Sequence, residues 1–270
     1  MDTISAIALG FIQGLTEFLP VSSSGHLVLM HSLLGVVESH DLAFDAVLQL
    51  STVLAVVVYF YEEIYILLQT VMRKLGRLPV NERDMVMVKA LGLGTLPALI
   101  LGFFLEDIME TAFRSPLLVA LVLVLGSILF MFAEYRYDNC FHDRELTPKT
   151  GWKIGFFQAL ALVPGFSRSG ATIAGGMLLG LSRSDAAKFS FLLSVPIILG
   201  SGLKKLYEFI TMGDAAPWAP ILFASLVAFA VGLAAIHFML GFVRRHTLWP
   251  FIWYRILLAS FIVYFVIFNS

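Results

Sequence analysis

Charged residues and cysteine are both scarce in this 270-residue chain. Only 14% of its residues are charged, against about 25% in a typical soluble domain, whereas 59% are hydrophobic. The single cysteine, Cys140, excludes an intramolecular disulfide and a cysteine-based zinc site. The net charge of −1 provides no basic face for nucleic acid. No single globular core can bury so many apolar residues, so we expect an all-α integral membrane protein in contact with the bilayer.

Six apolar segments are long enough to cross a bilayer as helices, since a crossing needs roughly 20 mainly apolar residues. They lie at about 44–68, 86–105, 116–135, 186–203, 218–242 and 249–269. Three connections, 70–85, 136–153 and 243–248, hold 10 Lys and Arg residues, and the connections of the other side hold three. Because cytoplasmic loops carry the excess of Lys and Arg, we predict that these three are cytoplasmic and that both termini lie outside.

Two further apolar segments, at about 3–35 and 154–182, cannot cross if the six helices already alternate correctly. Each must enter and leave on its own side, as a re-entrant helix–loop–helix segment. Helix-breaking residues, among them Pro20 and Pro164, lie near the middle of both. Non-helical backbone at membrane depth is tolerated only where it is buried in protein or lines a wet cavity. The two tips are therefore where we expect the functional site.

The same two segments match each other at a constant offset of 145 residues, without a gap. Gly10-Phe11-Ile12-Gln13 aligns with Gly155-Phe156-Phe157-Gln158, and Ser22-Ser23-Ser24-Gly25 aligns with Ser167-Arg168-Ser169-Gly170. The charge count makes the helices that follow the two copies run in opposite directions, so we predict an inverted repeat. Such repeats place a site near the bilayer midplane. We expect one membrane domain, with repeat 1 at about 1–135 and repeat 2 at about 145–270.

Arg168 is the only charged residue of the second segment and lies at its centre. A charge at the centre of a membrane helix costs on the order of 2.5–3.5 kcal/mol, so it usually faces a cavity or a partner. Hydroxyl groups lie on both sides of it in the sequence, from Ser167 before it and from Ser169 and Thr172 after it. A guanidinium fork with hydroxyls and a Gly-rich turn before a helix suits a phosphate. The alternative is that Arg168 only pairs with an acid such as Glu17 and holds the repeats together.

The first segment carries a candidate metal site and a candidate nucleophile. Gln13 and Glu17 are four residues apart and share one helical face. Their oxygen atoms suit Mg²⁺ or Ca²⁺. The run Ser22-Ser23-Ser24-Gly25-His26 places hydroxyl nucleophiles within a few residues of a titratable base. Serine and glycine are also common where membrane helices pack, which is the alternative explanation for this run.

At these motifs the chain closely resembles the bacterial undecaprenyl-diphosphate phosphatase family, also called the bacitracin-resistance protein family. The matching residues are Gln13-x-x-x-Glu17, Pro20-Val-Ser-Ser-Ser-Gly-His26 and Pro164-Gly-Phe-Ser-Arg-Ser-Gly-Ala-Thr172, and the likeness in length and hydropathy order spans nearly the whole chain. The family has Glu or Gln at position 13, so Gln13 is a weaker candidate metal ligand than Glu17.

The resemblance implies hydrolysis of the polyprenyl diphosphate lipid undecaprenyl diphosphate to undecaprenyl phosphate and inorganic phosphate. It implies a need for Mg²⁺ or Ca²⁺ and a site that opens to the outer face of the bacterial cytoplasmic membrane. This reaction recycles the lipid carrier for peptidoglycan and other wall polymers, and overproduction confers bacitracin resistance. A homodimer is among the assemblies that we consider.

For the mechanism we predict that Arg168 grips the terminal phosphate. The hydroxyls expected to assist it are those of Ser22, Ser24, Ser167, Ser169 and Thr172. Ser23 is the preferred nucleophile because it aligns with Arg168 across the repeat, and Glu17 and His26 would activate it and protonate the leaving group. Attack by His26 or directly by water stays open. The competing function is a lipid-phosphate transporter or flippase of the same architecture, which needs a phosphate grip but no nucleophile.

Overall fold

The computed structural model describes residues 2–34, 41–111, 115–139, 144–211 and 218–269, and Cys140 lies outside these ranges. The helices within them are α1 (Thr3–Phe18), α2 (Ser23–Leu34), α3 (Asp41–Tyr59), α4 (Tyr61–Leu75), α5 (Glu82–Thr111), α6 (Pro116–Asn139), α7 (Pro148–Leu160), α8 (Arg168–Leu178), α9 (Arg183–Thr211), α10 (Trp218–Val243) and α11 (Trp249–Asn269). The described residues form no strand. The predicted all-α class is confirmed.

Five of these helices, α5, α6, α9, α10 and α11, are long and apolar enough to cross a membrane. They contain the predicted crossings 86–105, 116–135, 186–203, 218–242 and 249–269. Together with the bent pair described next, they bear out the prediction of a multi-pass membrane protein.

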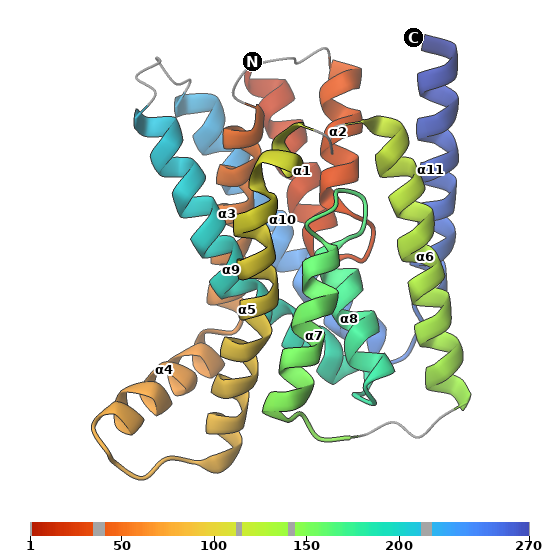
Figure 1. The fold of residues 1–270 in the computed structure, drawn as a ribbon. Coiled ribbons are helices and arrows are strands. Elements are labelled where there is room, and N and C mark those ends of the chain that lie inside the picture. Colours follow the sequence, from red (N-terminus) through yellow and green to blue (C-terminus); the bar gives the residue numbers. More distant parts are fainter. Residues whose placement is uncertain (1, 35–40, 112–114, 140–143, 212–217, 270) are drawn as a thin grey trace.

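The predicted crossing at 44–68 is not one continuous helix. The helix breaks at Phe60, and the axes of α3 and α4 meet at 84°. α4 begins with Glu62 and Glu63 and ends with Arg73 and Lys74, and charged side chains of this kind are costly within a bilayer. The carboxylate of Glu63 accepts a hydrogen bond of 2.8 Å from Lys188 of α9. Figure 1 shows α4 lying crosswise at the end of the bundle opposite the termini.

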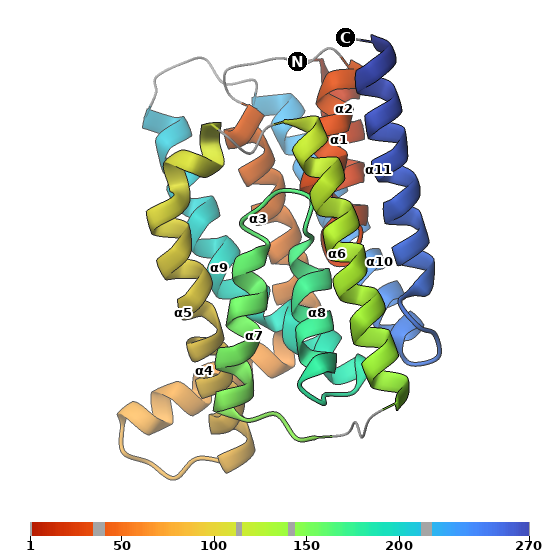
Figure 2. The same cartoon turned by 45° about the vertical axis from the view of Figure 1, so that its right-hand side comes forward.

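Two helical hairpins enter the bundle from opposite ends (Figures 1 and 2). The α1–α2 hairpin descends from the end that holds both termini and turns back midway, and the α7–α8 hairpin does the same from the other end. α3 and α9, which follow the two hairpins, pack side by side and run in opposite directions. This arrangement is the one expected of two re-entrant segments in an inverted repeat, while the repeat boundaries and the depth of each hairpin in a bilayer stay predictions.

Aligned glycines bring each hairpin against a crossing helix. α1 packs against α10, and a Cβ atom on Gly10 would lie 2.3 Å from the backbone oxygen of Ala224. α7 packs against α5, where a Cβ atom on Gly155 would lie 2.5 Å from the backbone oxygen of Gly94. Small residues allow membrane helices to approach this closely. Gly10 and Gly155 occupy matching positions in the sequence repeat, so both halves use the same packing contact.

Candidate active site

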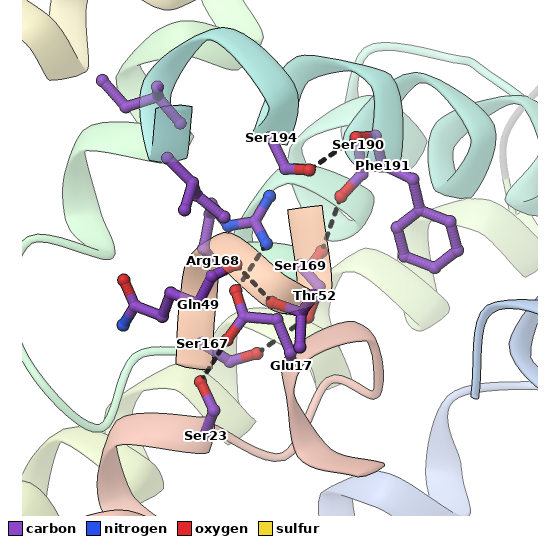
Figure 3. Close-up of polar contacts among 12 residues, drawn as sticks. Glu17, Ser23, Gln49, Thr52, Ser167, Arg168, Ser169, Ser190, Phe191 and Ser194 are labelled. Carbon is purple, nitrogen blue, oxygen red and sulfur yellow. Dashed lines mark hydrogen bonds and ion pairs between the residues drawn. The ribbon is translucent and has the colours of Figure 1, made fainter. Parts of the chain in front are cut away.

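The turns of the two hairpins contact each other in the middle of the bundle. The backbone N–H of Gly165 donates to Oγ of Ser24 at 3.3 Å, and Oγ of Ser169 donates to the backbone oxygen of Leu19 at 3.1 Å. The predicted contact between the two tips is therefore confirmed. Residues about 140 positions apart in the chain form one polar cluster here (Figure 3).

Both turns have a serine with positive φ at aligned positions. Ser22 has φ of 74° and Ser167 has φ of 72°, a left-handed conformation that costs a non-glycine residue on the order of 1–3 kcal/mol. Each side-chain oxygen accepts a hydrogen bond from the N–H three residues later, of Gly25 at 3.3 Å and of Gly170 at 3.2 Å. These bonds cap α2 and α8, so two helix N-termini converge on the cluster. Helix N-termini favour anions such as phosphate.

The carboxylate of Glu17 lies at the centre of the cluster (Figure 3). Its Oε1 accepts from Nη2 of Arg168 at 2.7 Å, and its Oε2 accepts from Oγ of Ser23 at 2.7 Å and from Nε2 of Gln13 at 2.9 Å. Only 7% of Glu17 is exposed, whereas Ser23 and Arg168 are half-buried. A serine hydroxyl that donates to a buried carboxylate has its proton acceptor in place, which is what activation of a serine nucleophile requires.

His26 faces a different partner from the one predicted. Its Nδ1 lies 2.7 Å from the backbone oxygen of Ser22, and its Nε2 lies 2.7 Å from the hydroxyl of Tyr254. A carbonyl oxygen only accepts, so in the neutral ring Nδ1 carries the hydrogen and Nε2 accepts from Tyr254. The lone pair of His26 is thus directed toward α11, and the structure brings Glu17 rather than His26 to the hydroxyl of Ser23.

Thr172 is also directed away from the central cluster. Its hydroxyl donates to the backbone oxygen of Arg168 at 2.8 Å and lies 2.6 Å from Oγ of Ser190 on α9. The residue comes one helical turn after Arg168, on the side of α8 that packs against α9. The structure therefore does not bring this predicted phosphate-binding hydroxyl to Glu17.

Two buried polar atoms of the cluster have no hydrogen-bond partner among the described residues: Oε1 of Gln13 and Nη1 of Arg168. Leaving such an atom unpaired costs about 1–3 kcal/mol. A cation would satisfy the free acceptor, and a phosphate oxygen would satisfy the free donor. The described residues contain no group of three or more acidic, His or Cys side chains that could hold a metal alone. Gln13 and Glu17 nevertheless fit Mg²⁺ or Ca²⁺ if a substrate diphosphate supplies further oxygen ligands.

Known proteins match this chain over almost its full length. The family model described as bacitracin resistance protein BacA matches residues 6–261. A protein named undecaprenyl-diphosphatase from Trichlorobacter lovleyi is 44% identical over 259 residues, which cover 95% of this chain and 94% of that protein. The chain belongs to the bacitracin resistance protein BacA family. The family resemblance inferred from the two motifs is confirmed.

Other relatives of this BacA family chain carry the same name. The undecaprenyl-diphosphatase of Chloroherpeton thalassium is 40% identical over 275 residues, covering 97% of this chain and 96% of that protein. The undecaprenyl-diphosphatase of Micrococcus luteus is 40% identical over 264 residues, covering 96% of this chain and 95% of that protein. Each of these names is that of a phosphatase, so the comparisons give no support to the transporter or flippase alternative.

One buried charged residue of this BacA family member, Arg255, is not among the site residues predicted from the sequence. Arg255 of α11 is fully buried and donates to the backbone oxygens of Gly165 and Leu123, both at 3.0 Å, and to Oγ of Ser127 at 3.2 Å. It is the only charged residue of the predicted crossing 249–269. The argument that singled out Arg168, a lone charge in an apolar segment, applies equally to Arg255. The partner of His26, Tyr254, could not have been found in this way, because 228 residues separate the two.

Proposed function

We propose that this protein hydrolyses undecaprenyl diphosphate to undecaprenyl phosphate and inorganic phosphate. The observation that carries the proposal is the 2.7 Å hydrogen bond from Ser23 to Glu17, on a carboxylate that also holds Arg168. A serine hydroxyl, a carboxylate able to accept its proton and a guanidinium thus lie together where two helix N-termini converge. A binding protein or transporter needs the guanidinium but has no use for the first two. The names of the relatives support the lipid diphosphate as substrate.

In the proposed reaction, Oγ of Ser23 attacks the terminal phosphorus while its proton passes to the carboxylate of Glu17. The bond between that phosphorus and the bridging oxygen breaks, and undecaprenyl phosphate leaves with the bond's electron pair. The departing undecaprenyl phosphate takes up the proton from Glu17. Water then attacks the phosphoserine and gives a proton to Glu17, the bond between phosphorus and Oγ breaks, and that proton passes from Glu17 to Oγ, so phosphate leaves with Ser23 restored. Phosphoryl transfer depends mainly on positioning and charge stabilisation. The short Ser23–Glu17 contact favours Ser23 over His26 as the attacking group.

Arg168 has the geometry to stabilise the transferring phosphoryl group. Its Nη2 pairs with Glu17 at 2.7 Å, and its Nη1 has no partner among the described residues. A guanidinium fork binds phosphate oxygens through two donors at once. A purely structural Arg168–Glu17 ion pair would account for the first contact but would leave the second nitrogen and the Ser23 hydroxyl without a role.

Gln13 and Glu17 are the residues that would hold Mg²⁺ or Ca²⁺ in this proposal. The unpaired Oε1 of Gln13 supports the assignment. When bound, the cation would neutralise charge on the diphosphate. Glu17 accepts from Arg168 on Oε1 and from Ser23 and Gln13 on Oε2, and its carboxylate would supply the charged ligand for the cation.

The lipid tail needs an apolar path beside the cluster. A groove of about 180 Å³ runs between α2, α6 and α11, and Val28, Leu29, Val119 and Ile262 are among its lining residues. Val119 also packs against Gly25, at the start of α2. We propose that the tail lies here, with the site open to the outer face of the cytoplasmic membrane, so that the reaction recycles the carrier for wall synthesis. The homodimer stays a prediction that sedimentation in detergent would test.

Phosphate release by the purified protein in detergent tests the proposed function. No compartments exist in detergent, so transport cannot take place. We expect release from undecaprenyl diphosphate and none from undecaprenyl phosphate, which lacks the anhydride bond. Folded protein that releases no phosphate from the diphosphate in the presence of Mg²⁺ or Ca²⁺ would contradict the proposal.

A further inference from the structure

Helix α11 contacts both turns of the candidate active site through two adjacent residues. The hydroxyl of Tyr254 lies 2.7 Å from Nε2 of His26, which is one turn into α2. The two rings are stacked, with an angle of 2° between their planes. Arg255 donates to the backbone oxygen of Gly165, in the turn before Arg168. One helix, outside both hairpins, therefore holds the turn that carries Ser23 and the turn that carries Arg168.

The environment of Arg255 is unusual for a charged group. Within the described residues, every group that bonds to it is neutral: two backbone oxygens and the hydroxyl of Ser127. Its Nη1 has no partner there, and its guanidinium lies 4.8 Å from the centre of the Phe130 ring. A buried charge without an opposite charge is costly and is usually tied to function. Packing alone would be served better by an apolar residue of the same size.

The turn that Arg255 holds packs closely against α6. Gly165 has φ of 99°, and a Cβ atom there would lie 2.7 Å from the backbone oxygen of Val119. Gly126 leaves the space that the guanidinium occupies, since a Cβ atom on it would lie 2.2 Å from Nη2 of Arg255. The backbone of the turn, the glycine opposite and the arginine thus fit one another, and the position of Arg168 three residues later depends on them.

We infer that Tyr254 and Arg255 are positioning residues of the proposed reaction, Tyr254 for the His26 turn and Arg255 for the Arg168 turn. The inference rests on the proposed function, since it concerns the alignment of groups from two hairpins around one phosphate. Small displacements of such groups slow phosphoryl transfer strongly while they leave the binding of a long lipid tail almost unchanged. The signature is a loss of kcat at nearly constant KM.

The first test replaces Tyr254 by Phe, with Tyr264→Phe as the matched control. Tyr264 lies on the same helix and is 58% exposed. Removal of the Tyr254 hydroxyl should lower kcat about tenfold, because the free energy of one positioning hydrogen bond corresponds to about that change in rate. KM should change by less than about twofold, and orthovanadate, which mimics the transferring phosphate, should inhibit about tenfold more weakly. Tyr264→Phe should match the wild type in all three.

The second test uses Arg255→Lys, which keeps the charge but loses the planar fork. We expect the same pattern as for Tyr254→Phe: lower kcat, weaker vanadate inhibition and nearly unchanged KM. Wild-type kinetics in both variants would overturn the inference. A loss of rate that merely matches the loss of folded protein, with an unchanged vanadate inhibition constant, would also overturn it, because unfolding lowers the number of active molecules and not their affinity for vanadate. Failure of the wild type to release phosphate would instead count against the proposed function.

Discussion

Oγ of Ser23 lies 2.7 Å from Oε2 of Glu17, although a non-helical turn separates their helices. The left-handed backbone at Ser22 turns the chain so that α2 starts beside the end of α1. The same carboxylate reaches Arg168 on the other hairpin. Glu17 therefore links the candidate nucleophile to the candidate phosphate-binding group, and each can be tested separately.

Replacement of Ser23 by Ala should remove the nucleophile without disturbing the fold. We expect turnover to fall by about 10³-fold or more, as for other nucleophile knockouts, while the lipid diphosphate still binds. Phosphate release and equilibrium binding of the lipid measure the two effects. Ser201→Ala, an exposed serine of α9, is the control and should keep full activity. Near-normal turnover in Ser23→Ala would remove Ser23 from the mechanism.

Replacement of Arg168 by Lys keeps the positive charge, but the single ammonium group of lysine cannot both hold Glu17 and reach a phosphate oxygen. We expect kcat/KM for phosphate release to fall by about 100-fold or more, in line with removal of a group that stabilises the transition state. Arg244→Lys, an exposed residue between α10 and α11, is the matched control. If Arg168 only fastens the two hairpins, the variant should lose thermal stability in detergent yet keep its turnover per folded molecule.

Replacement of Glu17 by Gln should remove the proton acceptor and leave the size of the side chain unchanged. General-base groups contribute about 10²–10⁴-fold, so kcat should fall within that range. The exposed Glu145→Gln is the control. Stopped-time phosphate assays on protein that elutes as a single folded species measure the loss. Retention of more than about a third of the wild-type rate would show that Ser23 is not activated by Glu17.

A chelator should abolish phosphate release, and Mg²⁺ or Ca²⁺ should restore it. The Gln13→Glu variant tests where the cation binds, because a carboxylate in place of the amide adds a charged oxygen ligand. We expect this variant to reach half-maximal activity at a lower free cation concentration, by about tenfold. Titration of activity against free cation gives the value. Equal half-activating concentrations in both proteins would place the cation away from Gln13.

The sequence was informative wherever a signal was local or periodic. Five crossings followed from runs of apolar residues, and the two tips followed from prolines and glycines inside apolar segments. The match between Ser22-x-x-Gly25 and Ser167-x-x-Gly170 pointed to related turns, and both serines do have a positive φ, of 74° and 72°. In each case the residues that decide the structure are neighbours in the chain.

The errors and omissions concern contacts between distant residues. The apolar run at 44–68 gave no sign that the helix breaks at Phe60 or that Lys188 pairs with Glu63, 125 positions away. The predicted partnership of His26 with Ser23 was inferred from their closeness in sequence. The hydroxyl of Tyr254, supplied by the last helix, binds His26 instead. Tertiary packing decides such pairings, and one sequence does not record it.

A double-mutant cycle on Ser23→Ala and Arg168→Lys most directly tests whether the two hairpins form one phosphate-cleaving site. Residues that act as a unit have strongly non-additive effects. We therefore predict that the double variant releases phosphate no more than a few-fold more slowly than the worse single variant. Losses that multiply in full would mean that Ser23 and Arg168 act independently, and would contradict the account.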